Sequence, residues 1–161
     1  MFMQRAITVA VSAVIFASCN PFHRSQAVEM SAKDVNLNTR WHASLASPGS
    51  LAGVVQMTGS ATMSPAPDDG NTTVTLSLAN AAPGGVHPWS LHYGQCGSDL
   101  GVFGSVGAYK AIEIGGDGRG EASARVSRET PVMGTYYVSV QASAANRETT
   151  VACGNLAPPT Q

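Results

Sequence analysis

The chain has 161 residues and a formal net charge of −1, from 9 Lys and Arg against 10 Asp and Glu, and only 12% of its residues are charged. Globular domains usually contain about 25% charged residues, so small and uncharged polar side chains must form much of this surface. The sequence has no basic run that would neutralise phosphates, which excludes nucleic-acid binding. The length suits one domain with its own core and does not suit two.

Residues 1–18 have the features of a secretory signal peptide. Arg5 provides a basic start, and residues 6–17 are all apolar or small. That stretch is too short for a transmembrane helix, which needs about 20 residues, but it matches the core of a signal peptide. Two small residues stand just before Cys19, as in the bacterial lipobox, whose cysteine is lipidated and becomes the mature N-terminus. We therefore expect a lipid anchor on Cys19. An ordinary cleaved signal that leaves Cys19 as a free thiol is the alternative.

Export and lipidation together predict where the protein resides. Several acyl chains on Cys19 would attach the chain stably to a membrane, because each buried methylene contributes about 0.8 kcal/mol. Residues 19–38 mix polar and small side chains without a sustained period, which is typical of a tether. The expected location is a membrane surface that faces the periplasm or the cell exterior, and the sequence indicates no particular protein partner.

Two cysteines remain once Cys19 is set aside, namely Cys96 and Cys153. An even number of cysteines in an exported domain favours a disulfide, because that compartment is oxidising. A bridge that closes so long a loop stabilises a fold by about 4 kcal/mol in the chain-entropy model. Two free thiols or half of a metal site are the less favoured alternatives.

Short strands separated by turn residues fill the domain, which we place at residues 39–156. The clearest strand is residues 72–78, where Val74, Leu76 and Leu78 alternate with hydroxyl side chains. The expected strands cover residues 40–46, 51–63 with a bulge at Gly59, 72–78, 86–93, 109–114, 121–126, 135–142 and 149–153. About eight strands at this spacing predict an antiparallel Greek-key sandwich or barrel.

The remaining segments are predicted to be turns and loops. A glycine-rich excursion around Cys96 spans residues 94–107, and a tight hairpin turn is expected at residues 115–118. No segment shows helical periodicity with capping residues. Residues 157–161 are expected to form a loose tail, so the predicted fold class is all-β with eight antiparallel strands.

Histidines are the first residues to consider for chemistry. The chain contains four of them, His23, His42, His87 and His92. Ser90 and His92 share one face of their predicted strand, because side chains alternate along a strand. His87 falls on the opposite face from His92 unless Pro88 bends the chain. No Ser, His and acidic residue stand in a recognisable nucleophile arrangement.

Four features of the domain occur in a characteristic order. They are a Gly-Gly-Val-His-Pro-Trp lead-in at residues 84–89, an extended segment that ends in His92, a glycine-flanked Cys96, and Ala152-Cys153-Gly154 after the strand Tyr-Tyr-Val-Ser-Val-Gln. With these features, residues 41–156 resemble the Cu/Zn superoxide dismutase superfamily, in particular its short bacterial lipoprotein branch. The resemblance implies an eight-stranded Greek-key barrel in which Cys96 and Cys153 form the intrachain disulfide.

The copper-ligand positions depart from the family's pattern. The family holds copper with histidines, two in a His-x-His on one strand and another on a late strand, because imidazole serves both copper oxidation states. In this chain Ser90 stands where the first histidine of that motif is expected, and Gln141 stands at the late-strand position. His92 is the one ligand that the pattern leaves in place.

Two further parts of the site also differ. The segment that corresponds to the zinc loop, residues 98–104, contains no histidine. Arg147 lies six residues ahead of Cys153, out of line with the family's substrate-guiding arginine, and Thr150 lies three ahead. A copper site in this chain would have to use His92 and His87 as ligands. His42 could join them only if the arrangement departed still further from that of the family.

The resemblance and its departures together predict an envelope-anchored, superoxide dismutase-like domain that has lost most of its copper ligands. We expect a non-catalytic binding or structural module with no cofactor. Two alternatives remain open. One is a copper-dependent dismutase that converts superoxide to oxygen and hydrogen peroxide in an altered site, and the other is a copper-binding or storage lipoprotein.

Overall fold

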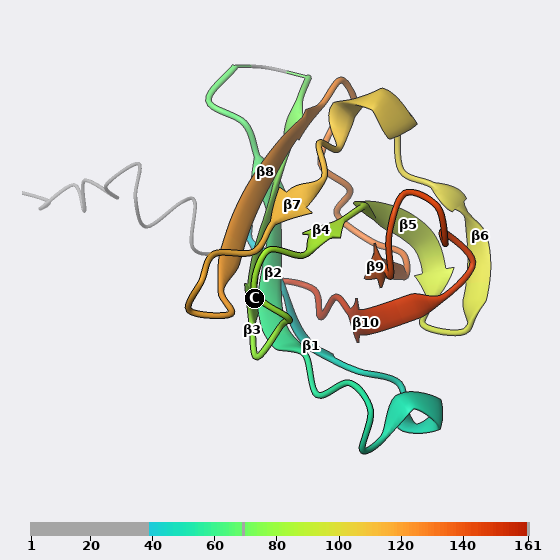
Figure 1. Ribbon diagram of the computed structural model, residues 1–161. Coiled ribbons are helices and arrows are strands. Elements are labelled where there is room, and N and C mark those ends of the chain that lie inside the picture. Colours follow the sequence, from blue (N-terminus) through green and yellow to red (C-terminus); the bar gives the residue numbers. More distant parts are fainter. Residues whose placement is uncertain (1–38, 69, 161) are drawn as a thin grey trace, which may run out of the picture.

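The computed structural model describes residues 39–68 and 70–160, and these residues form an all-β structure (Figure 1). The predicted signal peptide, the lipidation site Cys19 and the tether at residues 19–38 lie outside the described residues. Two short 3-10 turns, η1 at Gly49–Leu51 and η2 at Val106–Ala108, are the helical segments of the described part. Within that part, no helix is long and apolar enough to cross a bilayer.

Ten strands make up the described fold. They are β1 (Trp41–Ala46), β2 (Thr58–Pro65), β3 (Thr72–Ala79), β4 (Val86–His87), β5 (Trp89–Gln95), β6 (Ser98–Val102), β7 (Ile112–Glu113), β8 (Gly120–Val126), β9 (Tyr136–Gln141) and β10 (Thr150–Asn155). Eight of them form one antiparallel sheet in the order β6-β5-β9-β10-β1-β2-β3-β8, and β4 pairs with β7 in a small second sheet. The predicted all-β, antiparallel class is confirmed.

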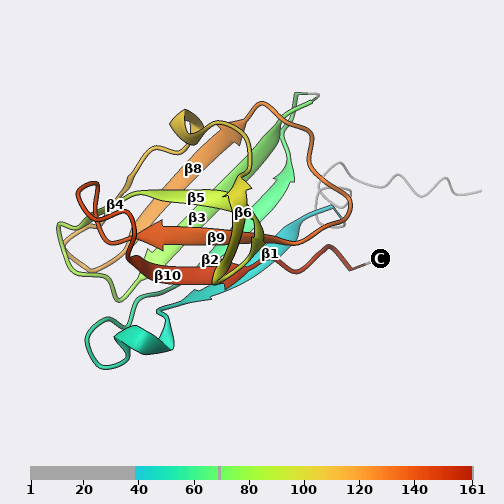
Figure 2. The same ribbon diagram turned by 90° about the vertical axis from the view of Figure 1, so that its right-hand side faces the viewer.

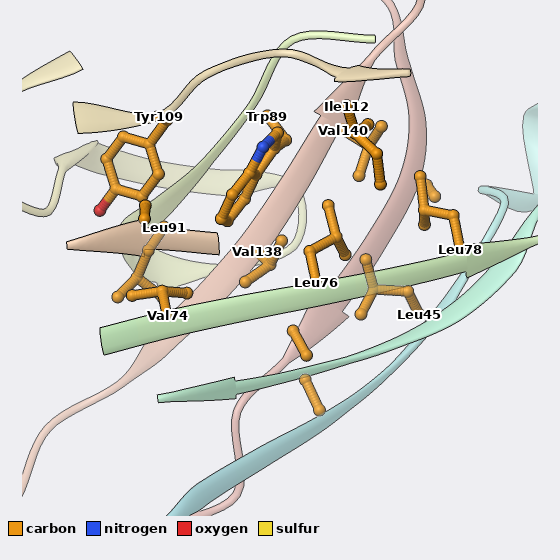
Figure 3. Close-up of a cluster of buried hydrophobic side chains, with 14 of the residues drawn as sticks. Leu45, Val74, Leu76, Leu78, Trp89, Leu91, Tyr109, Ile112, Val138 and Val140 are labelled. Atoms are coloured by element: carbon orange, nitrogen blue, oxygen red, sulfur yellow. The ribbon is translucent and has the colours of Figure 1, made fainter. Parts of the chain in front are cut away.

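The large sheet curls into a half-barrel around a single apolar core (Figures 1 and 2). Side chains from strands far apart in the sequence meet there, among them Leu45 of β1, Leu76 of β3, Leu91 of β5 and Val138 of β9 (Figure 3). Each of these four is at most 3% exposed. Their burial removes apolar surface from water, which is the main force that holds such a sheet in its curled form.

The alternation predicted on β3 is confirmed. Val74, Leu76 and Leu78 are buried, whereas Thr75 and Ser77 on the other face are exposed. Because successive side chains of a strand point to opposite faces, this pattern fixes which side of β3 packs on the core.

The strand predicted over residues 51–63 is shorter and has no bulge. η1 and a turn with Gly53 at φ 83° take up its first part, and β2 begins only after them. Gly59 pairs with Leu78 in an unbroken register. A side chain at Gly59 would meet the backbone oxygen of Ser77, so this glycine allows β2 and β3 to approach closely.

The extended segment at residues 86–93 divides at Pro88 into β4 and β5, because proline has no N–H to donate to a ladder. The glycine-rich excursion that follows is not a loop throughout, since it contains β6, which pairs with β5. Gly94 (φ 100°) and Gly97 (φ 84°) adopt left-handed conformations that let the chain turn back. Most side chains of β6 are exposed, so the strand has no apolar alternation by which the sequence would reveal it.

The strand predicted over residues 109–114 reduces to β7. The Tyr109 hydroxyl donates to the carbonyl oxygen of Phe103 at 2.7 Å. The carbonyl oxygen of Lys110 accepts a hydrogen bond from Nε1 of Trp89, also at 2.7 Å. The first part of this segment is therefore held by side-chain contacts, and a neighbouring strand pairs only with its end.

The C-terminal tail is not loose at its start. Ala157 and His42 of β1 exchange two backbone hydrogen bonds, with N–O distances of 2.7 Å and 3.1 Å. The ordered domain therefore extends one residue further than the predicted boundary at residue 156, because its last bridge uses the free backbone edge at the start of β1.

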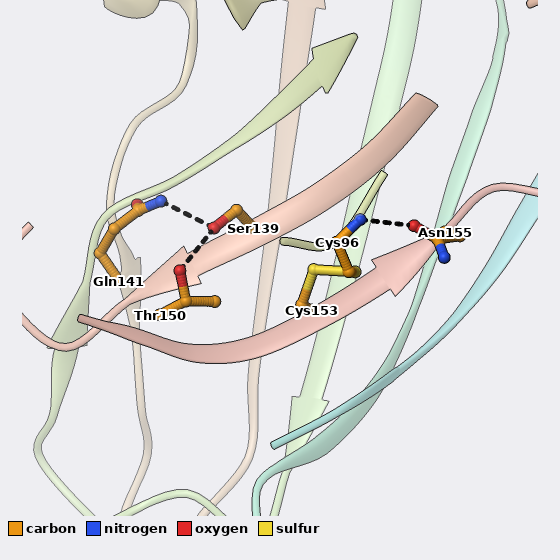
Figure 4. Close-up of a disulfide and its surroundings, with 6 residues drawn as sticks. All are labelled: Cys96, Ser139, Gln141, Thr150, Cys153 and Asn155. Atoms are coloured by element: carbon orange, nitrogen blue, oxygen red, sulfur yellow. Dashed lines mark hydrogen bonds between the residues drawn. A yellow bond between two sulfur atoms is a disulfide. The ribbon is translucent and has the colours of Figure 1, made fainter. Parts of the chain in front are cut away.

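The predicted pairing of Cys96 with Cys153 is confirmed (Figure 4). The bond joins the turn after β5 to β10, across a sequence separation of 57 residues. Asn155 supports the same turn, because its Oδ1 accepts a hydrogen bond from the backbone N–H of Cys96 at 2.8 Å. The disulfide thus links the β5–β6 hairpin to β10, across the intervening strand β9.

Candidate functional site

β5 and β9 are buried on both faces, whereas β1 and β3 alternate between buried and exposed positions. Their core-facing side chains are apolar, and their outer-facing side chains include buried polar groups. Ser90 lies opposite Ser139, and His92 lies opposite Tyr137, in the β5–β9 ladder. Because buried polar groups cost free energy unless they find partners, this outer face is where chemistry is most expected.

Three side chains form a continuous hydrogen-bonded series on this face. Oγ of Ser90 lies 2.8 Å from Nε2 of His92, and Nδ1 of His92 lies 2.8 Å from Oδ1 of Asp99 on β6. Ser90 and His92 are each 8% exposed, while the Asp99 side chain is 55% exposed at the rim. No nucleophile arrangement is recognisable in the sequence, but the structure brings a Ser, a His and an acid into one hydrogen-bonded series.

The direction of these hydrogen bonds follows from the acid. An ionised carboxylate only accepts hydrogen bonds, so Nδ1 of His92 carries the proton shared with Asp99. When the ring carries only this proton, Nε2 is the acceptor and the Ser90 hydroxyl donates to it. The hydroxyl proton of Ser90 is therefore directed at Nε2 of His92, which can accept it.

Asp99 is held in place by the hairpin that the glycines create. Its Oδ1 also accepts a hydrogen bond from the backbone N–H of Gly101 at 2.8 Å. That bond is the main reason why the pKa of the Asp99 carboxyl lies below its usual value; burial opposes the shift, and the side chains of His92 and Tyr137 add to it. The carboxylate is therefore ionised at neutral pH.

Tyr137 on β9 completes the surroundings of His92. The two rings lie with their centroids 5.0 Å apart and their planes tilted by 31°. Burial raises the pKa of the Tyr137 hydroxyl to about 12, and the charge and hydrogen bond of Asp99 add to the shift. The tyrosine is thus neutral across the physiological range and fixes one face of the imidazole.

A second hydrogen-bonded group, drawn in Figure 4, includes Ser139, which lies opposite Ser90 in the β5–β9 ladder. Nε2 of Gln141 donates to Oγ of Ser139 at 3.1 Å, and the hydroxyls of Ser139 and Thr150 lie 3.3 Å apart. Gln141 therefore uses its side chain within β9 and β10 and makes no hydrogen bond to His92. The hydrogen bond at Nε2 of His92 is to Ser90.

Two adjoining cavities open over this face. One, of about 350 Å³, is lined mainly by polar side chains, which include His92, Asp99 and Glu148. The other, of about 320 Å³, is lined by Ser90 and by apolar residues such as Val106. The side chains that line both are Gln141 and Arg147. Arg147, which was out of line in the sequence, therefore does reach the site.

His87 does not join His92. Its Nδ1 lies 3.1 Å from the backbone oxygen of Gln141, and its ring lines a different cavity, together with Met57 and Val151. Nε2 of His87 is buried and has no hydrogen-bond partner. His42 is exposed on β1, which β10 and β9 separate from β5.

The donor set at the site does not fit copper. Copper centres in proteins rely on several nitrogen or sulfur donors that converge on one point. Here His92 offers Nε2, but the neighbouring positions present the hydroxyl of Ser90 and the neutral amide of Gln141. Among residues 39–68 and 70–160, no three His, Cys, Asp or Glu side chains are grouped as metal ligands would be.

Comparisons with known proteins add no assignment: the sequence matches no family model and no curated protein.

Two of the three residues in the hydrogen-bonded series, Ser90 and His92, are predictable from the sequence. Ser90 and His92 were placed on one face from strand alternation, as the structure has them. Asp99 was seen only as part of a shortened loop without histidines. A signal was present, because glycines on both sides of Cys96 allow a hairpin whose returning strand places an acid near His92.

Proposed function

We propose that this chain is an exported, lipid-anchored domain of the superoxide dismutase-like type that does not dismutate superoxide and acts as a binding module. One observation carries the proposal. The nitrogen of His92 that faces the expected ligand positions is hydrogen-bonded to Ser90 at 2.8 Å. A metal at that nitrogen would have to displace the serine and would gain only hydroxyl and amide oxygens in return, which are poor copper ligands.

The strand connections support the finer fold assignment. β1, β2 and β3 are successive neighbours in the sheet, and β10 returns after the intervening strands to pair with β1. Residues 115–119 form the tight turn between β7 and β8, in which the Gly115 N–H donates to the Arg119 oxygen at 2.8 Å. A later strand that returns to lie beside the first of three successive neighbours is the arrangement of a Greek key, and the order β10-β1-β2-β3 has this form. We infer a Greek-key barrel in which β4 and β7 bridge the open side of the half-barrel.

The attachment to a membrane rests on the sequence alone. Cys19 follows an apolar stretch of signal-peptide length, and residues 20–38 would separate the lipid from the domain. Such a tether would hold the domain at a membrane surface in an oxidising compartment. The Cys96–Cys153 disulfide fits that compartment, because such bonds are rare in reducing surroundings.

The two cavities favour a small ligand with both polar and apolar parts. Asp99 and Glu148 give the polar cavity negative charge, and Arg147 lies where the two cavities meet. The apolar cavity has room for a few carbon atoms beside Trp89 and Tyr109. Concave sites with apolar walls and a few converging polar groups are the usual form of small-molecule sites.

Copper loading of the purified full chain tests the proposal. The oxidised protein would be equilibrated with Cu(I) and with Cu(II), freed of unbound metal, and assayed for copper content and superoxide turnover. We expect far less than one copper per chain and no turnover above that of the buffer. One tightly held copper with fast turnover would instead establish a dismutase, and one held copper without turnover would establish a storage protein.

A further inference from the structure

We propose that Ser90 is an acyl-accepting nucleophile, served by His92 as general base and oriented through Asp99, and that the site hydrolyses small carboxylic esters. The inference goes beyond the binding role proposed above and does not depend on the superoxide dismutase resemblance. It rests on the geometry of three side chains and of the two cavities between which they lie.

The geometry is that of an activated serine. The distances from Ser90 Oγ to His92 Nε2 and from His92 Nδ1 to Asp99 Oδ1 are both 2.8 Å. A nucleophile within about 2.6–3.2 Å of a base that a third group orients is the general signature of covalent catalysis by hydroxyls. The arrangement recurs on unrelated folds, so it is recognised by these distances and roles and not by order along the chain.

The strands hold the three groups rigidly. Ser90 and His92 lie two positions apart on β5, a strand paired on both sides, with β9 and with β6. Asp99 stands on β6, whose hairpin is fastened by the Cys96–Cys153 disulfide. Sites built on paired strands keep their geometry better than sites built on loops.

The cavities match the two halves of an ester. Ser90 lines the cavity whose walls include the apolar side chains of Pro88, Trp89 and Val106. His92 lines the polar cavity. An ester whose acyl group fills the apolar side would thus present its carbonyl carbon to Ser90 and its alcohol oxygen to the polar side, where His92 can protonate it.

Two side chains are placed to stabilise negative charge on the carbonyl oxygen. Gln141 and Arg147 line both cavities, so both lie where an ester would cross from one to the other. The Gln141 amide uses one N–H in its bond to Ser139, and a primary amide has a second N–H to donate. Donors of this kind, aimed at developing negative charge, are worth about 100- to 1,000-fold in rate when they are well placed.

The chemical step balances without a cofactor. Ser90 Oγ forms a bond to the carbonyl carbon while its proton moves to His92 Nε2. The bond from that carbon to the alcohol oxygen breaks, and the alcohol leaves with the proton from His92. Water then attacks the acyl-Ser90 ester, gives a proton to His92, and releases the carboxylic acid as Ser90 recovers its proton.

A fluorophosphonate probe tests the nucleophile directly, since it forms a stable adduct with activated serines. We expect Ser90 Oγ to bond to the probe's phosphorus as fluoride leaves, so that the full, oxidised chain gains the mass of one probe less hydrogen fluoride, located by peptide mapping on Ser90. Ser90→Ala should abolish labelling, and His92→Gln should slow it by at least about 100-fold, the usual lower value of a general base. The control is Ser123→Ala, because Ser123 is exposed on β8 and outside both cavities.

The role of Asp99 needs its own comparison, since it acts through His92. Asp99→Asn should slow labelling by at least about 10-fold, because the amide no longer fixes the imidazole in the reactive tautomer. Asp99→Glu keeps the carboxylate and should recover part of the rate. Equal thermal unfolding midpoints for the two variants would separate this effect from a loss of structure.

Turnover of para-nitrophenyl acetate completes the test. The wild-type chain should hydrolyse it faster than the Ser90→Ala variant does. A folded wild-type chain that fails to take up the probe or to turn over the ester, or a Ser90→Ala variant that does both as well as wild type, would overturn the inference. Copper content is measured separately, so failure here leaves the proposed binding function untouched, and copper uptake leaves the labelling result interpretable.

Discussion

Cys153 on β10 lies directly opposite Ser139 on β9, and Ser139 lies directly opposite Ser90 on β5. Cys153, Ser139 and the candidate nucleophile Ser90 therefore lie side by side across three neighbouring strands. Paired residues of neighbouring strands point to the same face of a sheet. The Cys96–Cys153 bond thus spans the outer face next to the site and fixes the hairpin that carries Asp99.

Removal of the disulfide should cost both stability and site geometry. Replacement of Cys96 and Cys153 by alanine opens a loop of 57 residues, which should lower the free energy of unfolding by about 4 kcal/mol in the chain-entropy model. Urea unfolding monitored by tryptophan fluorescence measures the loss. Wild type under reducing conditions is the matched control. An unchanged unfolding midpoint would contradict the structural role of this bond.

Restoration of the missing imidazoles tests the inferred relation to copper proteins. Ser90→His and Gln141→His together would put three imidazoles on the face that now holds one. We expect copper to bind at least about 100-fold more tightly than in wild type. Loss of a residue that only hydrogen-bonds to a metal ligand already lowers metal affinity about 10- to 100-fold, so the addition of two direct ligands should have an effect at least as large. Competition with a copper chelator gives the dissociation constants. No gain in affinity would contradict the assigned ligand positions.

The Tyr137 hydroxyl should lose its proton at a higher pH than an ordinary tyrosine does. Its pKa is raised to about 12 from a usual 10.0, so the folded protein keeps a proton that the unfolded chain has lost. This group therefore stabilises the fold fully below pH 10, and its contribution disappears as the pH rises from 10 to 12. Ultraviolet absorbance of tyrosinate follows the titration, and Tyr137→Phe identifies the component that belongs to this residue.

The same titration reports on Asp99. Asp99→Asn removes a negative charge beside the Tyr137 hydroxyl, so the Tyr137 midpoint should fall, although burial keeps it above the ordinary value. A midpoint that does not move would show that the two side chains are not in contact in solution.

Gly94 should be less replaceable than its neighbour Gly97. Both have positive φ, but a side chain at Gly94 would also meet the backbone oxygen of Ser98, whereas the space at Gly97 is open. We expect Gly94→Ala to lower the free energy of unfolding by roughly 1–3 kcal/mol, and Gly97→Ala to lower it by less. Urea unfolding compares the two variants. Equal effects would argue against a tight β5–β6 hairpin.

The sequence predicts those features that depend on the alternation of side chains between the two faces of a strand. Val74, Leu76 and Leu78 reveal β3, and the same rule places Ser90 and His92 on one face. These predictions hold because strand geometry has a fixed period of two residues, whatever surrounds the strand.

Features without such a period were missed. Asp99 reaches His92 through a hairpin whose register depends on positive-φ glycines and on an exposed strand. Arg147 reaches both cavities from a loop, and its distance along the chain from Cys153 gave no hint of that. Contacts of this kind depend on tertiary packing, which local pattern does not encode.

On this view, hydrogen bonds and not a metal organise the face around His92. Isotope-edited NMR of its imidazole nitrogens at neutral pH tests this most directly, with His92→Gln to assign the signals. We expect a protonated Nδ1, an unprotonated Nε2 that accepts from Ser90, and no change when one equivalent of Cu(I) is added. A shift of the Nε2 resonance on stoichiometric copper, or a proton on Nε2 in the free protein, would contradict it.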